Sequence, residues 1–211
     1  MYARSTSFMA QPGTIDEGIA DVRDHVMPAA MAVKGCVGLS MICDHESGRC
    51  ITTSAWSTRV ALNRSGKTML PLLQHASEIF GSQPTLDLWE IAVVHRHDVS
   101  GEGACVRCTW LNLDPAGLSH SFETYRLAML PAFEEMDGFC SASLMVDPVT
   151  GRAVSSVTFA SREAIVASRP AAERLRSRTA EDVGNTVADI QEFELALAHL
   201  HVPETSLPRR S

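Results

Sequence analysis

Four histidines form two pairs that could bind a metal. His95-x-His97 and His199-x-His201 each end a strand-like stretch. Alternate residues of a strand share one face, so the two imidazoles of a pair could hold one ion. Solvated strand ends explain the same pattern without a metal. We favour that interpretation and predict no metal site, because the fold inferred below would place the two pairs at distant rims.

Two arginines are candidates for anion binding. Each lies two residues before a threonine on a strand-like stretch, so the two side chains share a face. The pairs are Arg4 with Thr6 and Arg107 with Thr109. An inward-facing arginine beside a hydroxyl could bind a carboxylate or another oxyanion through two hydrogen bonds. The alternative, which we favour, is an ion pair with a glutamate of an adjacent strand, such as Glu90 or Glu194.

Aromatic and sulfur-containing side chains give weaker signals. Trp56 and Trp110 could line a pocket for an aromatic molecule, although large aromatics between a sheet and its helices more often form core. The run Ser65-Gly66-Lys67-Thr68 ends like a phosphate-binding loop, but Ala61 replaces the required glycine and the run falls within a helix pattern. Cys105 and Cys108 look like half a zinc site, yet on a strand they face opposite ways. We therefore predict core cysteines there.

Composition narrows the class of protein. The chain has 211 residues, 45% of them hydrophobic, and a net charge of −7, which argues against nucleic acid or an anionic membrane as the main partner. Arg174, Arg176 and Arg178 form the only basic cluster, which we interpret as a solvated helix face. Six cysteines fall in apolar or strand-like stretches, as in a reducing compartment. With no long apolar run and no basic-then-apolar leader, we expect a cytoplasmic protein.

The segments that we expect to position these residues occur twice in the sequence. The stretch 35–56 recurs at 138–159, and every matched pair is 103 positions apart: Gly35 with Gly138, Asp44 with Asp147, Gly48 with Gly151, Arg49 with Arg152, and Trp56 with Phe159. The same offset relates Arg4 to Arg107 and the mid-helix Pro28 to Pro131. A chance repeat would not preserve hydrophobic phase, turn glycines and a proline together. The chain is therefore a tandem duplication.

Each copy has the order β-α-β-β-α-β. In the first copy we expect strands over 3–9, 37–44, 49–56 and 88–97, and helices over 14–34 and 58–80. Two such ferredoxin-like units, with helices on one face of each antiparallel sheet, predict an α+β fold. Their bare faces should pack face to face as one α/β barrel within the chain. We divide the chain into a first repeat (1–97), a linker (98–104), a second repeat (105–203) and a tail (204–211).

A family resemblance rests on these repeated residues. In the first copy they are Pro28-Ala29, Gly35, Asp44, Ser47-Gly48-Arg49, Trp56-Ser57 and Ala61; in the second they are Pro131-Ala132, Gly138, Asp147, Thr150-Gly151-Arg152, Phe159, Ser161 and Ala164. Both sets resemble the antibiotic biosynthesis monooxygenase-like group of the dimeric α/β-barrel superfamily. The resemblance implies a barrel that relatives build from two chains. It also implies a monomer with an intrachain pseudo-dimer, or a dimer through a different surface.

The resemblance leaves the activity open. It implies a small-molecule pocket between sheet and helices, with candidate ligand-binding residues Arg4, Thr6, Trp56 and His75 in one half and Arg107, Thr109 and Trp110 in the other. Our first hypothesis is a cofactor-independent monooxygenase of an aromatic or polyketide-like substrate, with no catalytic residue assigned. The alternative is a non-catalytic binding or structural barrel. A haem-binding or haem-degrading protein, with His75 as iron ligand, is the third.

Overall fold

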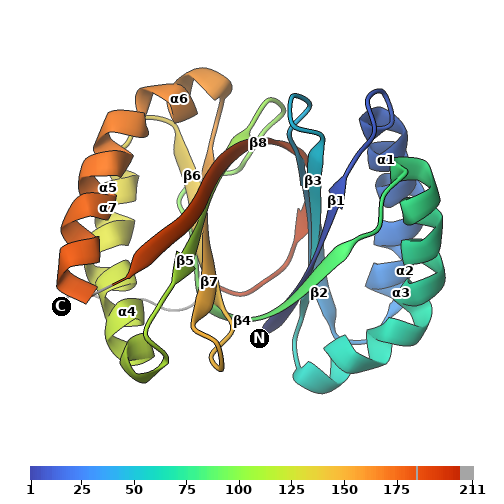
Figure 1. Ribbon diagram of the computed structural model, residues 1–211, viewed down its shortest axis with the longest axis horizontal. Coiled ribbons are helices and arrows are strands. Elements are labelled where there is room, and N and C mark those ends of the chain that lie inside the picture. The colour runs from blue at the N-terminus through green and yellow to red at the C-terminus, as the bar shows by residue number, and fades with distance from the viewer. Residues whose placement is uncertain (184, 205–211) are drawn as a thin grey trace. The chain divides into compact units, whose positions relative to one another are not determined.

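The computed structural model describes residues 1–183 and 185–204, and it contains the two predicted repeats (Figure 1). The elements of the first are β1 (Tyr2–Met9), α1 (Ile15–Asp21), a π-turn (Val22–Val26), α2 (Met27–Ala32), β2 (Cys36–Cys43), β3 (Arg49–Trp56), α3 (Arg59–Phe80) and β4 (Thr85–Arg96). Those of the second are β5 (Cys105–Asn112), a 3-10 turn (Pro115–Gly117), α4 (Leu118–Thr124), a π-turn (Tyr125–Met129), α5 (Leu130–Glu134), β6 (Phe139–Val146), β7 (Arg152–Phe159), α6 (Arg162–Ala167), α7 (Arg169–Val183) and β8 (Thr186–Leu200).

The eight strands are antiparallel neighbours in one closed order, β1-β3-β2-β8-β5-β7-β6-β4. The predicted α+β barrel of two tandem ferredoxin-like repeats is thereby confirmed. The long fourth strand of each repeat makes this closure possible. The second half of β4 pairs with β6, with His95 opposite Ala142, and the second half of β8 pairs with β2, with His199 opposite Leu39.

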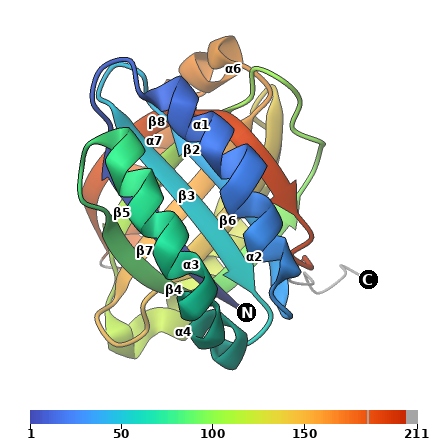
Figure 2. The same ribbon diagram turned by 90° about the vertical axis from the view of Figure 1, so that its right-hand side faces the viewer.

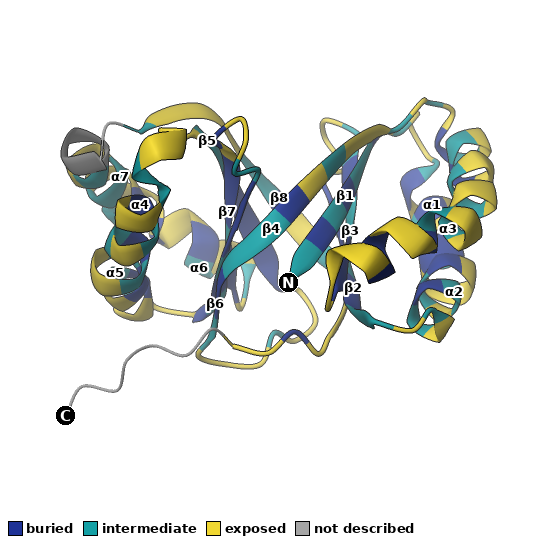
Figure 3. Cartoon of the chain, turned by 90° about the horizontal axis from the view of Figure 1, so that it is seen from below, coloured by how far each residue is buried: buried dark blue, intermediate teal, exposed yellow. Residues whose placement is uncertain are grey.

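Each repeat thus pairs the end of its fourth strand with a strand of the other repeat. With this exchange of strand ends, the chain divides into two compact units. Of the described residues, unit 1 comprises Met1–Trp89 and Glu194–Val202, and unit 2 comprises those of Glu90–Phe193 together with Pro203 and Glu204. In unit 1 the helices α1 and α2 follow one another along one line, and α3 lies beside them over the same face of the sheet (Figure 2). The helices turn their exposed residues away from the sheet and their buried residues toward the strands (Figure 3).

Proline sets the shape of the first helix in each repeat. Pro28 and Pro131 lack a backbone N–H and crowd the carbonyl four residues earlier, so a regular α-helix cannot continue through them. The chain widens into a π-turn just before each proline. There Met27 donates its N–H to Val22 O and Leu130 donates to Tyr125 O. The predicted interruption is thus a local widening, after which the helix resumes.

Hairpin turns and helix ends follow the predicted residues. Gly48 and Gly151 have φ of +79° and +75°. A Cβ on Gly48 would collide with the carbonyl oxygen of Ala10, just after β1, and a Cβ on Gly151 with that of Leu113, just after β5. Thr58 caps α3 by accepting a hydrogen bond from Ala61 N, and Gly81 ends that helix with φ of +67°. The six cysteines all lie within the described residues, and none of them forms a disulfide.

No helix among the described residues is both long enough and apolar enough to cross a membrane.

Candidate functional site

Arg4 reaches from β1 of unit 1 to the helix that covers the sheet. Its Nη1 donates to Ser65 Oγ at 3.0 Å, and its Nη2 donates to the carbonyl oxygen of Leu62 at 2.9 Å. Burial lowers the pKa of the half-buried Arg4 guanidinium from its ordinary value. No carboxylate among the described residues forms an ion pair with Arg4, so its charge is balanced only by neutral oxygens.

Arg107 repeats this arrangement in unit 2 and adds a counter-ion. Its guanidinium donates to Ser168 Oγ at 3.0 Å and to Ile165 O at 2.6 Å. Its Nε and Nη2 also contact one oxygen of Glu192, at 3.1 and 2.8 Å. The other oxygen of Glu192 accepts from Arg169 at 2.6 Å. The second repeat therefore neutralises an arginine that the first repeat leaves uncompensated.

The predicted ion pairs named the wrong glutamates. Neither Glu90 nor Glu194 pairs with Arg4 or Arg107, and the carboxylate beside Arg107 is Glu192. Glu192 precedes Glu194 by two residues on β8, so it lies on the same strand face. Trp89 and Phe193 are equivalent in the repeat, which makes Leu88 the counterpart of Glu192. A leucine cannot supply the missing charge for Arg4.

A cavity lies beside Arg4 between the sheet and helices of unit 1. Its volume is about 210 Å³. Most of the lining is apolar, and it comprises Arg4, Thr6, Phe8, Val22, Val26, Leu39, Thr52, Ser54, Gly66, Met69, Leu70, Leu72, Leu73, Ala76 and Leu86. For scale, an engineered apolar cavity of about 150 Å³ binds benzene. The cavity of unit 1 therefore has room for an aromatic ring system.

The equivalent cavity of unit 2 is largely filled. It measures about 60 Å³ because bulkier side chains replace small ones, with Tyr125 in the place of Val22 and Met129 in that of Val26. The Tyr125 hydroxyl contacts Ser155 Oγ at 2.9 Å and donates to Ser143 O at 3.1 Å. Burial raises the pKa of Tyr125, so this hydroxyl stays protonated at neutral pH. The second cavity can hold only small molecules.

Arg176 corrects the interpretation of the basic cluster. Arg174 and Arg178 are exposed as expected, but Arg176 is half-buried and lines the cavity of unit 2. Burial lowers the pKa of its guanidinium, and the nearby charge of Arg107 lowers it further. Only one of the three arginines therefore faces the interior.

The sequence-derived candidates fall into two groups. Thr6 and Thr109 line the same cavities as their arginines. Trp56 and Trp110 line neither of these two cavities. Trp56 is fully buried and donates its Nε1–H to Ser54 Oγ at 3.1 Å, whereas Trp110 packs edge-on against Phe193. The structure thus brings together each arginine–threonine pair and leaves both tryptophans in packing positions.

His75 lies outside the cavity. Its side chain is 56% exposed, with Nε2 at 3.6 Å from the buried Asp21 carboxylate and Nδ1 at 3.9 Å from Glu78. The haem hypothesis needs an iron ligand that points into the pocket. The residues that line the cavity of unit 1 include no histidine, cysteine or tyrosine, so they do not fit a haem iron.

Sequence reasoning missed the partners of the two arginines on the covering helices. Ser65 and Ser168 each donate to a carbonyl oxygen three residues earlier while accepting from the arginine. The separation of Arg4 from Ser65 equals that of Arg107 from Ser168, 61 residues in each case. This repeated offset was the signal that could have found them.

Known proteins resemble the chain in both sequence and structure. The uncharacterized protein Rv2558 of Mycobacterium tuberculosis is 51% identical over 205 residues, which cover 97% of this chain and 87% of that protein. No family model matches the chain. A proposed monooxygenase of Lactobacillus acidophilus superposes with a TM-score of 0.69 at 10% identity, covering 95% of this chain and 96% of its own.

An anthrone oxidase-like protein superposes with a TM-score of 0.63 at 12% identity, over 98% of this chain and 96% of its own. Identities this low establish the fold alone, whereas the identity to Rv2558 establishes kinship. The chain therefore belongs to the family of Rv2558, and its fold is that of the antibiotic biosynthesis monooxygenase-like α/β barrels.

Proposed function

We propose that the cavity of unit 1 binds an aromatic anion and oxygenates it without a cofactor. The observation that carries this proposal is the uncompensated guanidinium of Arg4 at the wall of an otherwise apolar cavity. A desolvated cation without a carboxylate favours a ligand that supplies the negative charge. The apolar lining favours a ligand whose remaining surface is aromatic.

The spare hydrogen-bonding capacity of Arg4 supports this assignment. A guanidinium has five N–H donors, and the contacts of Arg4 to Ser65 and Leu62 occupy two of them. These two contacts fix the side chain, so its remaining donors are oriented before a ligand arrives. A hydrogen bond to a charged group contributes about 1.5–3 kcal/mol, which would select an ionised phenol or enol over its neutral form.

Stabilising the anion is the step that such a reaction needs from the protein. For an anthrone, loss of one methylene proton to the solvent gives an enolate. Its carbon forms a bond to O₂, and the peroxide anion then takes up a proton from the solvent. The O–O bond of the resulting hydroperoxide then breaks as the second methylene proton leaves, giving a ketone and water. The balance is CH₂ + O₂ → C=O + H₂O, so no external reductant is required. Apolar walls such as Phe8 and Leu72 would exclude water during the reaction.

The test uses 1,8-dihydroxyanthrone as probe and an oxygen electrode. The protein should accelerate O₂ uptake above the spontaneous rate and yield the anthraquinone. Arg4→Gln should reduce kcat/KM by about tenfold or more, because it removes a charged hydrogen-bond donor. Arg64→Gln, an exposed arginine of the same helix as Ser65, is the matched control. Equal rates with and without protein would refute the oxygenase activity.

A non-catalytic binding protein is the second candidate. The observation that favours it is the lack of a general base, since the lining contains no carboxylate, imidazole, thiol or phenol. Such a protein would hold an aromatic that ionises in solution. Arg4-dependent quenching of the probe's fluorescence without any acceleration of O₂ uptake would select this function over the oxygenase.

A further inference from the structure

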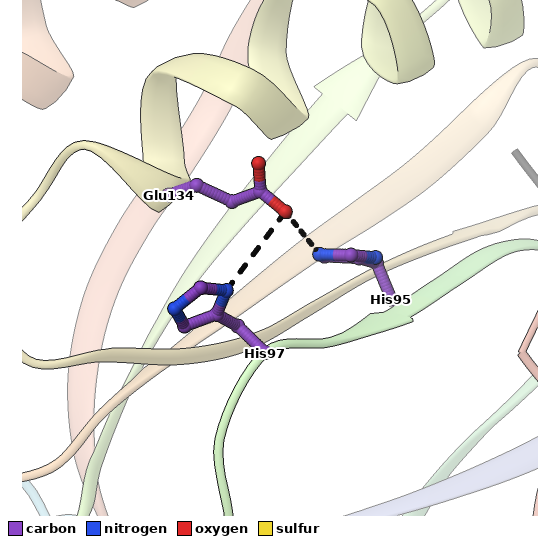
Figure 4. Close-up of side chains that lie close together, drawn as sticks. All are labelled: His95, His97 and Glu134. Atoms are coloured by element: carbon purple, nitrogen blue, oxygen red, sulfur yellow. Dashed lines mark hydrogen bonds and ion pairs between the residues drawn. The ribbon is translucent and has the colours of Figure 1, made fainter. Parts of the chain in front are cut away.

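Three side chains with metal-binding atoms converge at the end of β4 in unit 2 (Figure 4). His95 Nε2 lies 2.7 Å from Glu134 Oε1, and His97 Nδ1 lies 4.0 Å from the same oxygen. One ligand atom from each residue falls within 4.8 Å of the others. Glu134 lies 37 residues after His97 in the sequence and joins the two histidines only in the folded chain.

Backbone pairing places the three residues. His95 is opposite Ala142 in the pairing of β4 with β6, and His97 N donates to Cys140 O at 2.8 Å just after the strand ends. Glu134 is the last residue of α5, which leads through a short turn into β6. Both histidines and the glutamate are thus anchored to the same strand, β6.

Packing orients the imidazoles. The buried ring of Phe139 lies parallel to that of His95, with centroids 6.3 Å apart, and tilted against that of His97 at 6.0 Å. The His95 side chain is only 14% exposed and is therefore held, whereas the side chains of His97 and Glu134 are 53% and 37% exposed and can adjust. One fixed and two adjustable ligands suit the capture of an ion from solution.

We infer that His95, His97 and Glu134 form a binding site for a divalent transition-metal cation such as Zn²⁺. Ligand atoms around tetrahedral Zn²⁺ lie roughly 3.3 Å apart, given bond lengths of about 2.0–2.1 Å. The distances from the two histidines to Glu134 Oε1, 2.7 and 4.0 Å, bracket this value, and all three ligand atoms lie within 4.8 Å of one another, so modest side-chain rotations would bring them to it. Two imidazoles with one carboxylate favour Zn²⁺, Co²⁺ or Ni²⁺ over Ca²⁺ and Mg²⁺, which prefer oxygen ligands. A fourth position stays open to water or another ligand.

A hydrogen bond between His95 and Glu134 would account for two of the three side chains without a metal. It does not account for His97, whose Nδ1 also points to the carboxylate but from 4.0 Å, beyond hydrogen-bond distance. A cation between the three groups would satisfy all of them.

The first repeat supplies an internal comparison. His199 and His201 of unit 1 are the counterparts of His95 and His97, and their rings lie 4.6 Å apart. Met31 occupies the position of Glu134, and its sulfur contacts the thiol of Cys36 at 3.8 Å. Unit 1 therefore has two of the three ligands, and a single substitution would complete the set.

The test titrates Zn²⁺ into protein without a histidine tag by isothermal titration calorimetry, and Co²⁺ for its visible absorption. We expect one ion per chain. His95→Ala and Glu134→Gln should each weaken binding about tenfold or more, equivalent to about 1.4 kcal/mol per factor of ten. Zn²⁺ should raise the Tm of the wild-type protein but not of Glu134→Gln, and a chelator should reverse the shift. Circular dichroism verifies that each variant is folded.

Two further variants make the outcome decisive. The double variant His199→Ala/His201→Ala should leave the affinity unchanged, and Met31→Glu should raise the stoichiometry to two ions per chain. Unchanged affinity in both His95→Ala and Glu134→Gln would overturn the proposal, as would loss of binding in the His199/His201 variant. If Glu134→Gln does not fold, His97→Ala replaces it, because His97 is exposed. Weaker Zn²⁺ binding by His97→Ala would then support the site, and unchanged binding would overturn the proposal.

Discussion

The guanidinium of Arg107 donates two hydrogen bonds to one oxygen of Glu192, from Nε at 3.1 Å and from Nη2 at 2.8 Å. Arg107 is 4% exposed, so its charge has little access to water. Arg4, its counterpart in the first repeat, has Leu88 where Arg107 has Glu192. The duplication has thus preserved the arginine and its serine partner while giving the two copies different charge balances.

Removing the carboxylate of Glu192 should destabilise the protein. Glu192→Gln keeps the size of the side chain but leaves the buried Arg107 without a counter-charge, which should lower the free energy of unfolding by about 2–3 kcal/mol. Urea unfolding followed by circular dichroism measures this difference. The exposed Glu135→Gln is the control and should stay within about 0.5 kcal/mol of wild type. Equal stabilities of the two variants would contradict a structural role for the pair.

The same pair should make stability depend on acid pH. Burial alone would raise the pKa of Glu192, but hydrogen bonds from Arg169 and Arg107 outweigh it and hold the pKa below the ordinary value of 4.5. The unfolded chain then binds a proton more readily than the folded one, so the stabilisation is present above pH 4.5 and is lost as pH falls through the lower folded pKa. The stability difference between wild type and Glu192→Gln should therefore shrink on acidification. Unfolding curves from neutral pH to about pH 3 measure it, and a constant difference would exclude this linkage.

Two glycines should respond to alanine in opposite ways. Gly151 has φ of +75°, and an added Cβ would lie 2.1 Å from Leu113 O, so Gly151→Ala should cost roughly 1–3 kcal/mol. Gly66 lies within α3 with no atom near an added Cβ, so Gly66→Ala should stabilise the helix by about 0.5–1 kcal/mol. Thermal unfolding of both variants compares them. A stable Gly151→Ala protein would show that the hairpin can form a different turn.

Much of the fold could be predicted from the sequence because the duplication repeats local rules. Turn glycines, the proline in the first helix and the hydrophobic phase occur twice at one offset, so each copy supports the interpretation of the other. The exchange of strand ends was not predicted, since pairing of β4 with β6 depends on contacts between distant segments. Propensity and periodicity describe an element but not its partner.

The candidate site was also predicted only in part, because its residues come together from segments that are distant in the sequence. Arg4 and Arg107 carried a visible signal, namely a charged residue at matching places on a strand. Their partners come from a helix and from the fourth strand, where the predicted glutamate was displaced by two residues from the true one, Glu192. Glu134 had no sequence signal at all, because its neighbours His95 and His97 approach it only through the pairing of β4 with β6.

Strand closure should make folding independent of protein concentration. The eight strands follow a closed order within one chain, so no sheet edge among the described residues is left for pairing with a second chain. We therefore expect a monomer, or a dimer through another surface. The midpoint of urea unfolding should stay constant over about a hundredfold dilution, since linked dimerisation would shift it by mass action. A midpoint that falls on dilution would show that a second chain is part of the fold.

Leu88→Glu should reproduce in unit 1 the charge balance of unit 2. Leu88 is the counterpart of Glu192 and is 54% exposed, so a glutamate can be accommodated there. By analogy with the contact between Arg107 and Glu192, we expect it to pair with the guanidinium of Arg4. Its carboxylate would then compete with an aromatic anion, and the affinity for 1,8-dihydroxyanthrone should fall about tenfold or more, as expected for loss of a charged hydrogen bond. Leu88→Gln is the matched control, because it has the same shape without the charge and should bind the probe like wild type. If the two variants bind the probe equally well, charge at Arg4 does not select the ligand, and the cavity recognises its occupant by apolar contact alone.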